Sequence, residues 1–137
     1  MTQQVTESQA PLSTSSIGRH SELLAMAALI ADGWVVHEAT TPEAYDLIAI
    51  KDGRYIRAQV KTIKQRTRDG VDYYVIRGLK NSGQVYTLED CDVFIGVIDG
   101  RVYWTETRDI SEYWVKAIEV DEKWRMLPLN ISEKGAI

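Results

Sequence analysis

The sequence predicts an α+β / α/β domain, with an N-terminal helix packed on a mixed central β-sheet and a β-hairpin that carries the functional site. Three features support this fold class. A helical segment comes first, short apolar and β-branched strands follow it, and Asp-Gly pairs separate several of these strands. Asp-Gly between such strands is a strong hairpin signal, because a type I′ turn needs positive φ at both central residues.

The length of 137 residues fits one domain with its own hydrophobic core. Residues 1–16 are rich in Ser, Thr and Gln and predict a disordered leader, so residues 17–137 are expected to form a single domain. No apolar run approaches the roughly 20 residues of a membrane span, and the start lacks the pattern of a secretory signal. The lone Cys91 excludes an internal disulfide and a multi-cysteine zinc site. We interpret it as a buried structural thiol of a cytoplasmic protein, with a reactive nucleophile as the alternative.

Residues 17–31 are the predicted helix, and a short strand at residues 34–38 follows it. Ser16 is the expected N-cap, and Asp32-Gly33 ends the helix. The apolar stripe expected to face the sheet consists of Leu23, Met26, Ala27, Leu29 and Ile30.

Residues 44–62 form the predicted hairpin. Its two-residue loop makes Asp46 face Gln59, and it places Lys61 two positions further along the same face. The first strand is apolar on both faces, which predicts an internal strand with Asp46 as the one charge in its middle. An acid, an amide and a lysine should therefore meet at one end of the hairpin. A simple ion pair between Asp46 and Lys61 is the alternative, and periodicity does not separate the two.

Later strands are predicted from the remaining Asp-Gly turns. The turn at residues 69–70 leads into a strand at residues 73–80, and the turn at 99–100 joins a buried strand at 92–98 to one at 102–107. The tail is expected to add a short helix and a strand.

Glu22 lies on or beside the apolar stripe of the helix. A carboxylate in that position needs a partner. A salt bridge to Arg19 or an edge position is one interpretation. Combined with the opposed Asp46 and Gln59, metal binding is the better interpretation.

The charges are segregated, although the net charge is −4. Residues 51–80 hold nine bases and three acids, which gives +6, whereas residues 84–123 hold ten acids and four bases, which gives −6. A positive region beside the expected site suits a polyanion, with a solvated basic ribbon as the alternative.

These residues together carry a resemblance to a known family. Glu22 on the first helix, Tyr45-Asp46, twelve intervening residues and then Gln59-Val60-Lys61 resemble the signature of the PD-(D/E)XK nuclease superfamily. The likeness covers roughly residues 17–64, and it is most similar to the branch with glutamine at the second acidic position. That branch includes group I intron-associated homing endonucleases and, more distantly, Holliday junction resolvases. Tyr45 stands where proline is usual, and Gln59 stands where Asp or Glu usually binds metal.

The resemblance implies a restriction-endonuclease-like core and a metal-dependent DNA endonuclease that hydrolyses phosphodiester bonds. The implied ligands of Mg²⁺, with Mn²⁺ as the alternative ion, are Asp46, the Gln59 side chain, the Val60 carbonyl and Glu22. Lys61 would orient the attacking water or stabilise negative charge. The implied catalytic residues are thus Asp46, Gln59, Lys61 and Glu22. The expected phosphate contacts are Arg19, Lys64, Arg66 and Arg68.

The expected partner is duplex or branched DNA. A homodimer or homotetramer is expected, because cutting two strands symmetrically needs two active sites. Homing or restriction-like duplex cleavage is the main hypothesis. The alternatives are a Holliday junction resolvase, a non-catalytic DNA-binding or protein-interaction module on the same fold, and an unrelated α+β domain. An amide at a metal position brings no charge, which keeps the non-catalytic alternative open.

Overall fold

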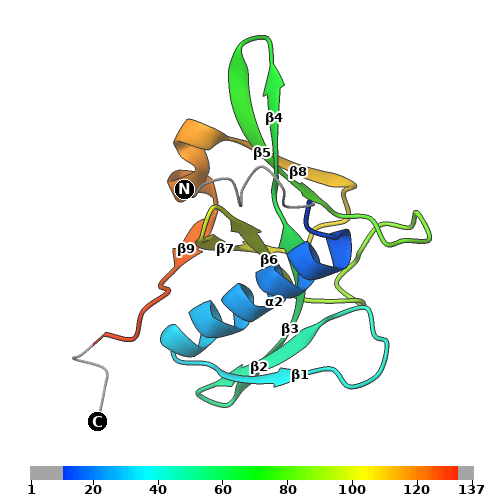
Figure 1. Cartoon of the computed structure of the whole chain (residues 1–137). Helices are drawn as coiled ribbons and strands as arrows, with labels where there is room; N and C mark the ends of the chain where they lie inside the picture. The colour runs from blue at the N-terminus through cyan, green and yellow to red at the C-terminus, as the bar shows by residue number, and fades with distance from the viewer. Residues whose placement is uncertain (1–10, 133–137) are drawn as a thin grey trace, which may run out of the picture.

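A six-stranded mixed sheet forms the centre of the computed structural model, which describes residues 11–132 (Figure 1). Its strands, in spatial order, are β1 (Val35–Glu38), β2 (Leu47–Lys51), β3 (Arg54–Thr62), β6 (Val93–Ile98), β7 (Arg101–Glu106) and β9 (Arg125–Leu127). Neighbours run antiparallel except β3 and β6, which are parallel. The predicted fold class, with its mixed sheet and packed N-terminal helix, is confirmed.

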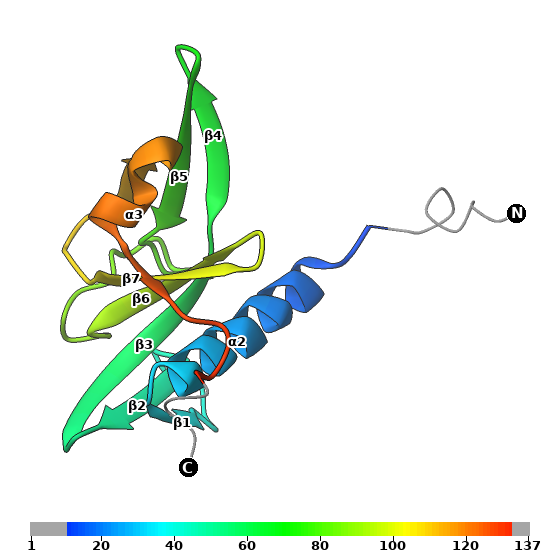
Figure 2. The same cartoon turned by 90° about the vertical axis from the view of Figure 1, so that its left-hand side faces the viewer.

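Helix α2 (Thr14–Ala31) lies across one face of this sheet (Figures 1 and 2). It begins earlier than predicted, because Ser13 and not Ser16 is the N-cap, and the Ser13 hydroxyl accepts the Ser16 N–H at 3.1 Å. Thr14–Ser16 are therefore helical and do not belong to a leader. Residues 1–10, which make up most of the expected leader, lie outside the described residues.

The buried side of α2 differs from the predicted stripe. The predicted residues Leu23 and Ile30 are each 51% exposed, and Ala27 is also exposed. The buried helix residues are Ser21, Ala25, Ala28 and Leu29. Of the predicted stripe, Leu29 is thus confirmed as buried and Met26 packs against the core. The buried residues recur at spacings of three and four, so they share one side of the helix, rotated away from Leu23, Ala27 and Ile30.

A second, three-stranded antiparallel sheet consists of β4 (Lys64–Arg68), β5 (Val71–Arg77) and β8 (Glu112–Lys116). The β4–β5 hairpin projects away from the main sheet (Figures 1 and 2). Its turn is the predicted Asp69-Gly70, and both residues have positive φ. β8 belongs to the predicted tail, which continues through the 3₁₀ turn Ala117–Glu119 and α3 (Val120–Lys123) to β9.

Two hydrophobic clusters cover the two faces of the main sheet. One cluster lies between α2 and the sheet and includes Ala28, Leu47 and Ile95. The other lies on the opposite face and includes Phe94 and Tyr113, whose ring centroids are 5.2 Å apart. The three-stranded sheet and α3 contribute to this second cluster, so the main sheet is covered on both sides.

The predicted hairpin register is confirmed. β2 pairs with β3 from Lys51↔Arg54 to Leu47↔Ala58, and Asp52 and Gly53 both have positive φ, as a type I′ turn requires. β2 lies between β1 and β3, so it is the internal strand that its apolar faces predicted.

Cys91 is fully buried, as predicted, and burial raises the pKa of its thiol. This favours the structural interpretation over a reactive thiolate. Within residues 11–132, no helix is both long and apolar enough to cross a membrane.

Candidate active site

Asp46 is fixed from both sides where it precedes β2. Its carbonyl accepts the Ala39 N–H at 3.0 Å, and its own N–H donates to the Ala58 carbonyl at 2.9 Å. The regular pairing of β2 with β3 ends at Leu47 and Ala58, so Asp46 lies just outside it. The Val60 N–H donates at 2.9 Å to Oδ2 of the Asp46 carboxylate. The other oxygen, Oδ1, has no hydrogen-bond partner among residues 11–132, and it reaches solvent, since the described part holds no buried unpaired side-chain oxygen.

The Asp46 carboxylate lies in an electrostatically unfavourable place. Burial raises its pKa, and the negative charges of Glu22 and Glu38 raise it further, while the Val60 N–H and the Lys61 ammonium lower it. Burial is the largest effect. A carboxylate of this kind is stabilised by an added cation.

Lys61 is half-buried on β3 and is held away from Asp46. Its ammonium donates weakly to the Leu79 carbonyl at 3.5 Å and lies 4.9 Å from the centre of the Tyr86 ring. Burial lowers the Lys61 pKa and nearby Arg77 lowers it further, although the Asp46 charge raises it. Among the ion pairs of the described residues there is none between Lys61 and Asp46, so the simple ion pair is not the arrangement found.

Glu22 reaches the same region from α2. Its side chain is 32% exposed and forms a salt bridge with Arg19 at 3.0 Å, which the sequence analysis gave as the alternative to metal binding. It also lines, with Asp46, a surface hollow of about 180 Å³. The full lining is Glu22, Glu38, Ala39, Thr41, Pro42, Glu43, Tyr45 and Asp46. The structure therefore brings two predicted site residues, Glu22 and Asp46, to one hollow.

The sequence interpretation missed the other acids of this hollow. Glu38 ends β1 and pairs in register with Leu47, directly after Asp46, while Glu43 lies in the loop before β2. Glu38 also binds Arg19 at 2.7 Å. The pairing of β1 with β2 could have been a signal for Glu38, because it places the end of one strand beside the start of the next. Arg19 is thus engaged by two carboxylates, which makes it a poor phosphate contact.

A partly buried hydrogen bond joins the helix to the strand that carries Lys61. The hydroxyls of Ser21 and Thr62 are 2.7 Å apart, and either can donate. Ser21 directly precedes Glu22, and Thr62 directly follows Lys61. This bond therefore fixes the two predicted site residues relative to each other.

Gln59 and Val60 lie on β3, directly before Lys61. Gln59 is half-buried and pairs with Phe94 of the parallel neighbour β6. The Val60 side chain lies in the hydrophobic cluster between α2 and the main sheet. The Val60 backbone N–H donates to the Asp46 carboxylate. The roles of the Gln59 amide and the Val60 carbonyl as metal ligands stay predictions.

The donor set near Asp46 fits a hard divalent cation. No group of three or more His, Cys, Asp or Glu side chains in residues 11–132 is arranged to hold a metal ion. The carboxylates of Asp46 and Glu22 line the same hollow, and they are oxygen ligands of the kind that Mg²⁺ prefers. The exposed Oδ1 and the raised pKa of Asp46 indicate an oxygen that a cation would stabilise.

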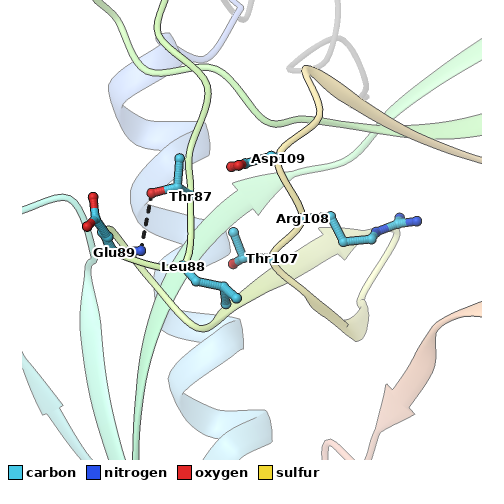
Figure 3. A pocket seen from close by; sticks show the side chains of 6 residues that line it. All are labelled: Thr87, Leu88, Glu89, Thr107, Arg108 and Asp109. Carbon is cyan, nitrogen blue, oxygen red and sulfur yellow. Dashed lines mark hydrogen bonds between the residues drawn. The ribbon is translucent and has the colours of Figure 1, made fainter.

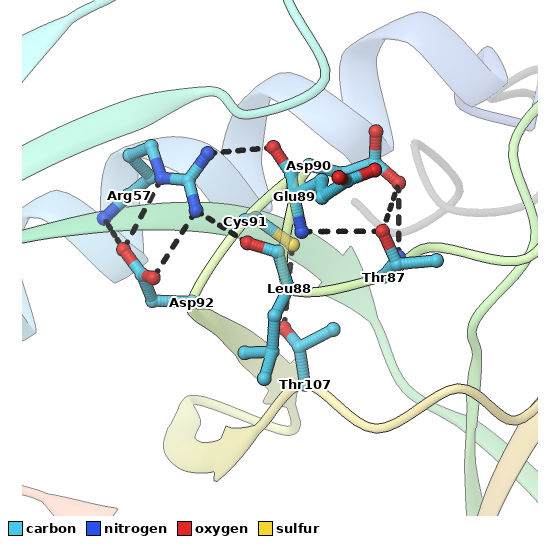
Figure 4. A network of polar contacts seen from close by, with 8 residues as sticks. All are labelled: Arg57, Thr87, Leu88, Glu89, Asp90, Cys91, Asp92 and Thr107. Atoms are coloured by element: carbon cyan, nitrogen blue, oxygen red, sulfur yellow. Dashed lines mark hydrogen bonds and ion pairs between the residues drawn. The ribbon is translucent and has the colours of Figure 1, made fainter.

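Arg57 binds the segment that precedes β6 (Figure 4). Its guanidinium donates to the carbonyls of Leu88 and Glu89 at 2.6 and 2.7 Å, and it pairs with Asp92 at 3.2 Å. These contacts fasten residues 87–92 to β3, directly after Tyr86. Arg57 belongs to the basic region counted from the sequence, yet its charge stabilises the fold.

A larger hollow of about 380 Å³ lies between the segments Thr87–Glu89 and Thr107–Asp109 (Figure 3). The Arg108 side chain points away from Thr87, which lies across the hollow (Figure 3). None of the predicted site residues lines it. The smaller hollow beside Asp46 is therefore the candidate active site.

The predicted phosphate contacts on β4 are exposed, as their role requires. Lys64, Arg66 and Arg68 alternate along a strand whose residues are all exposed. The guanidinium groups of Arg66 and Arg68 lie 5.8 and 4.4 Å from the centre of the Trp114 ring. Trp114 comes from β8, and nothing in the local sequence connects it with β4.

Comparisons with known proteins identify the family and a similar fold. A model of the PD-(D/E)XK endonuclease family matches residues 12–125. The solved structure of the bacterial homing endonuclease I-Ssp6803I is similar in fold, with a TM-score of 0.60 and 21% sequence identity over 75% of each chain. None of the curated proteins matches the chain significantly.

Proposed function

The chain belongs to the PD-(D/E)XK endonuclease family, and from this premise we propose that it is a metal-dependent endonuclease that cleaves duplex DNA. One observation carries the proposal. Asp46 is anchored by the Val60 N–H with its second oxygen exposed, and the half-buried Lys61 lies within electrostatic reach without pairing to it. An acid and a lysine that do not neutralise each other remain available to a metal and to a phosphate.

Asp46, Glu22, the Gln59 amide and the Val60 carbonyl would hold Mg²⁺ or Mn²⁺, which polarises a phosphate and activates water when bound. Lys61 binds a non-bridging phosphate oxygen and stabilises the negative charge that develops there. Tyr86 and the Leu79 carbonyl hold the Lys61 ammonium in place. The Ser21–Thr62 hydrogen bond keeps Glu22 and Lys61 at a fixed separation.

Lys64, Arg66 and Arg68 contact DNA phosphates in this proposal, because all three are exposed. Arg19 is left out of the set, since Glu22 and Glu38 both bind its guanidinium. We further propose that the protein acts in the cytoplasm as a homodimer or homotetramer, because symmetric cleavage of two strands needs two sites.

The test uses supercoiled plasmid, linear duplex and a four-way junction, each with Mg²⁺, with Mn²⁺ or with EDTA. The full chain should cut the duplex substrates only with metal, and Asp46→Asn and Lys61→Ala should lose that cleavage. Asp109→Asn and Lys123→Ala are matched controls at exposed positions and should cut normally. Absence of cleavage on every substrate contradicts the enzyme, and undiminished cleavage by the site variants contradicts the site.

A non-catalytic DNA-binding module is the second candidate. The neutral Gln59 and the lack of a three-ligand acidic or histidine cluster in the described part of the chain favour it. Strongly salt-dependent binding without metal-dependent cleavage would establish this candidate. Preferential cutting of the four-way junction would instead identify a resolvase.

A further inference from the structure

The three-stranded sheet has one face turned to the core and one face turned outward. Tyr74, Ile76 and Tyr113 belong to the buried cluster, so the residues that alternate with them point away from it. The outer face, defined by the registers of β4, β5 and β8, consists of Lys64, Arg66, Arg68, Val71, Tyr73, Val75, Arg77, Glu112, Trp114 and Lys116. Contacts of Trp114 with Tyr73 and Arg68 agree with this assignment.

The outer face is strongly positive in a chain whose net charge is −4. It carries five bases and one acid, which gives +4, and all five bases are exposed. Only Arg66 has an acidic partner on this face, Glu112, at 3.7 Å. A concentration of positive charge on an otherwise acidic molecule indicates a polyanionic ligand.

Trp114 orders the cations of the outer face. Arg68 lies 4.4 Å and Arg66 lies 5.8 Å from the centre of its ring, and Tyr73 meets its edge at 5.3 Å. A guanidinium held against an aromatic ring keeps its charge and loses less freedom on binding. Arg68 and Tyr73 already contact the Trp114 ring, so the ordered guanidinium groups are the main feature that this face presents to a ligand. The chemistry of this face therefore suits phosphates.

The outer face begins close to Lys61 along the chain. β4 follows β3 almost directly, so Lys64 is three residues after Lys61, and Arg77 lies at the same end of the three-stranded sheet, opposite Glu112. From Arg77 to Val71 the strand extends about 20 Å, at roughly 3.3 Å per residue. That length corresponds to roughly six base pairs of duplex, at about 3.4 Å each.

We propose that the outer face of the three-stranded sheet binds the sugar-phosphate backbone of duplex DNA on one side of the phosphate held at Lys61, over roughly half a helical turn. The proposal rests on the proposed function and deepens it by locating the DNA. Trp114 acts as a positioning residue for Arg66 and Arg68. Because the contacts are to phosphates, this face does not read sequence.

The test is a binding titration of the full chain in EDTA, with fluorescently labelled duplexes of unrelated sequence at several salt concentrations. Arg68→Gln and Lys116→Gln should each lower the slope of log Kd against log salt by about 0.9, and the double variant by about 1.8. The loss should be equal for all duplexes. Arg54→Gln is the matched control for a removed charge elsewhere, because Arg54 is exposed at the opposite end of β3 from Lys61, and it should bind as the wild type does.

Trp114→Leu tests the positioning role. It removes no charge, so the affinity should fall while the salt slope stays at the wild-type value. A structural role alone would lower stability without changing the affinity of the folded protein. Circular dichroism checks the fold of each variant. If Trp114→Leu does not fold, the affinity and salt slope of Arg68→Gln still test the proposal, because Arg68 is exposed.

Wild-type slopes and affinities in Arg68→Gln and Lys116→Gln overturn the inference, whether or not the protein cleaves DNA. Equal losses on single-stranded oligonucleotides overturn the duplex assignment, and competition by an acidic polypeptide as strong as that by DNA indicates a protein partner instead. Binding that behaves as expected in a protein without nuclease activity contradicts only the proposed function.

Discussion

The Thr62→Val substitution should destabilise the protein more than Ser21→Ala, although both remove the same hydrogen bond. The two hydroxyls lie 2.7 Å apart, and Ser21 is only 3% exposed. Thr62→Val therefore leaves a buried hydroxyl unpaired, which costs about 1–3 kcal/mol of unfolding free energy. In Ser21→Ala the remaining Thr62 hydroxyl is half-buried and can turn to water, so the loss should be about 0.5–1.5 kcal/mol.

Urea unfolding followed by circular dichroism measures these losses. With a slope of about 2 kcal/mol per molar urea, a loss of about 2 kcal/mol moves the midpoint by about 1 M. The double variant should be no less stable than Thr62→Val, because replacing both partners leaves no unpaired group. Losses that simply add in the double variant, or a Thr62→Val midpoint equal to that of the wild type, would refute the reasoning.

Other perturbations test the site and the packing. Gly78→Ala should destabilise the fold by about 1–3 kcal/mol, because its Cβ would lie 2.6 Å from the Ile110 carbonyl oxygen and 2.8 Å from the Tyr113 ring, and an unchanged urea midpoint would contradict this. The raised pKa of Asp46 means that the folded state binds this proton more tightly than the unfolded state. The wild type therefore loses stability as pH rises above 3.8, whereas Asp46→Asn has no carboxyl group at this position to titrate. The unfolding free energy of Asp46→Asn, relative to that of the wild type, should increase over this rise in pH. A difference that stays constant with pH would disprove the raised pKa of Asp46. The lowered pKa of Lys61 predicts that, as pH rises, cleavage begins to decline before pH 10.5, because the lysine loses its charge. Lys61→Arg should move this decline to higher pH, because arginine stays charged. A wild-type rate that only rises with pH would instead indicate that Lys61 acts as a base. EDTA should abolish cleavage and added Mg²⁺ restore it, and cleavage that persists in EDTA would exclude the metal.

The hairpin at the centre of the site was accessible from the sequence because its geometry is local. Asp52-Gly53 determines the turn, and the turn determines the register of β2 and β3. The same local reasoning placed Asp46 near β3. It did not foresee that the ladder ends before Asp46, where a side chain replaces the backbone as the partner of Val60.

Contacts between distant segments could not be read from the sequence. Glu38 reaches Arg19 across nineteen positions, and Trp114 of β8 meets Arg68 of β4. These pairs depend on strand order, which turn signals do not specify. The buried face of α2 was assigned correctly at Leu29 but wrongly at Leu23 and Ile30, because hydropathy ranks these two residues above the alanines that pack on the sheet.

The projecting tip of the β4–β5 hairpin has a consequence for how such a protein can diversify. The tip at Asp69-Gly70 is exposed, and a Thr67–Asp72 hydrogen bond of 2.7 Å closes it from within. Insertions at exposed loop tips cost little stability, since loop closure depends only weakly on length. Lys61 lies in β3 and Asp46 lies directly before β2, so both belong to the region of the main sheet, apart from this tip. New lengths and sequences at the tip can therefore accumulate by mutation while the chemistry of the site is inherited intact.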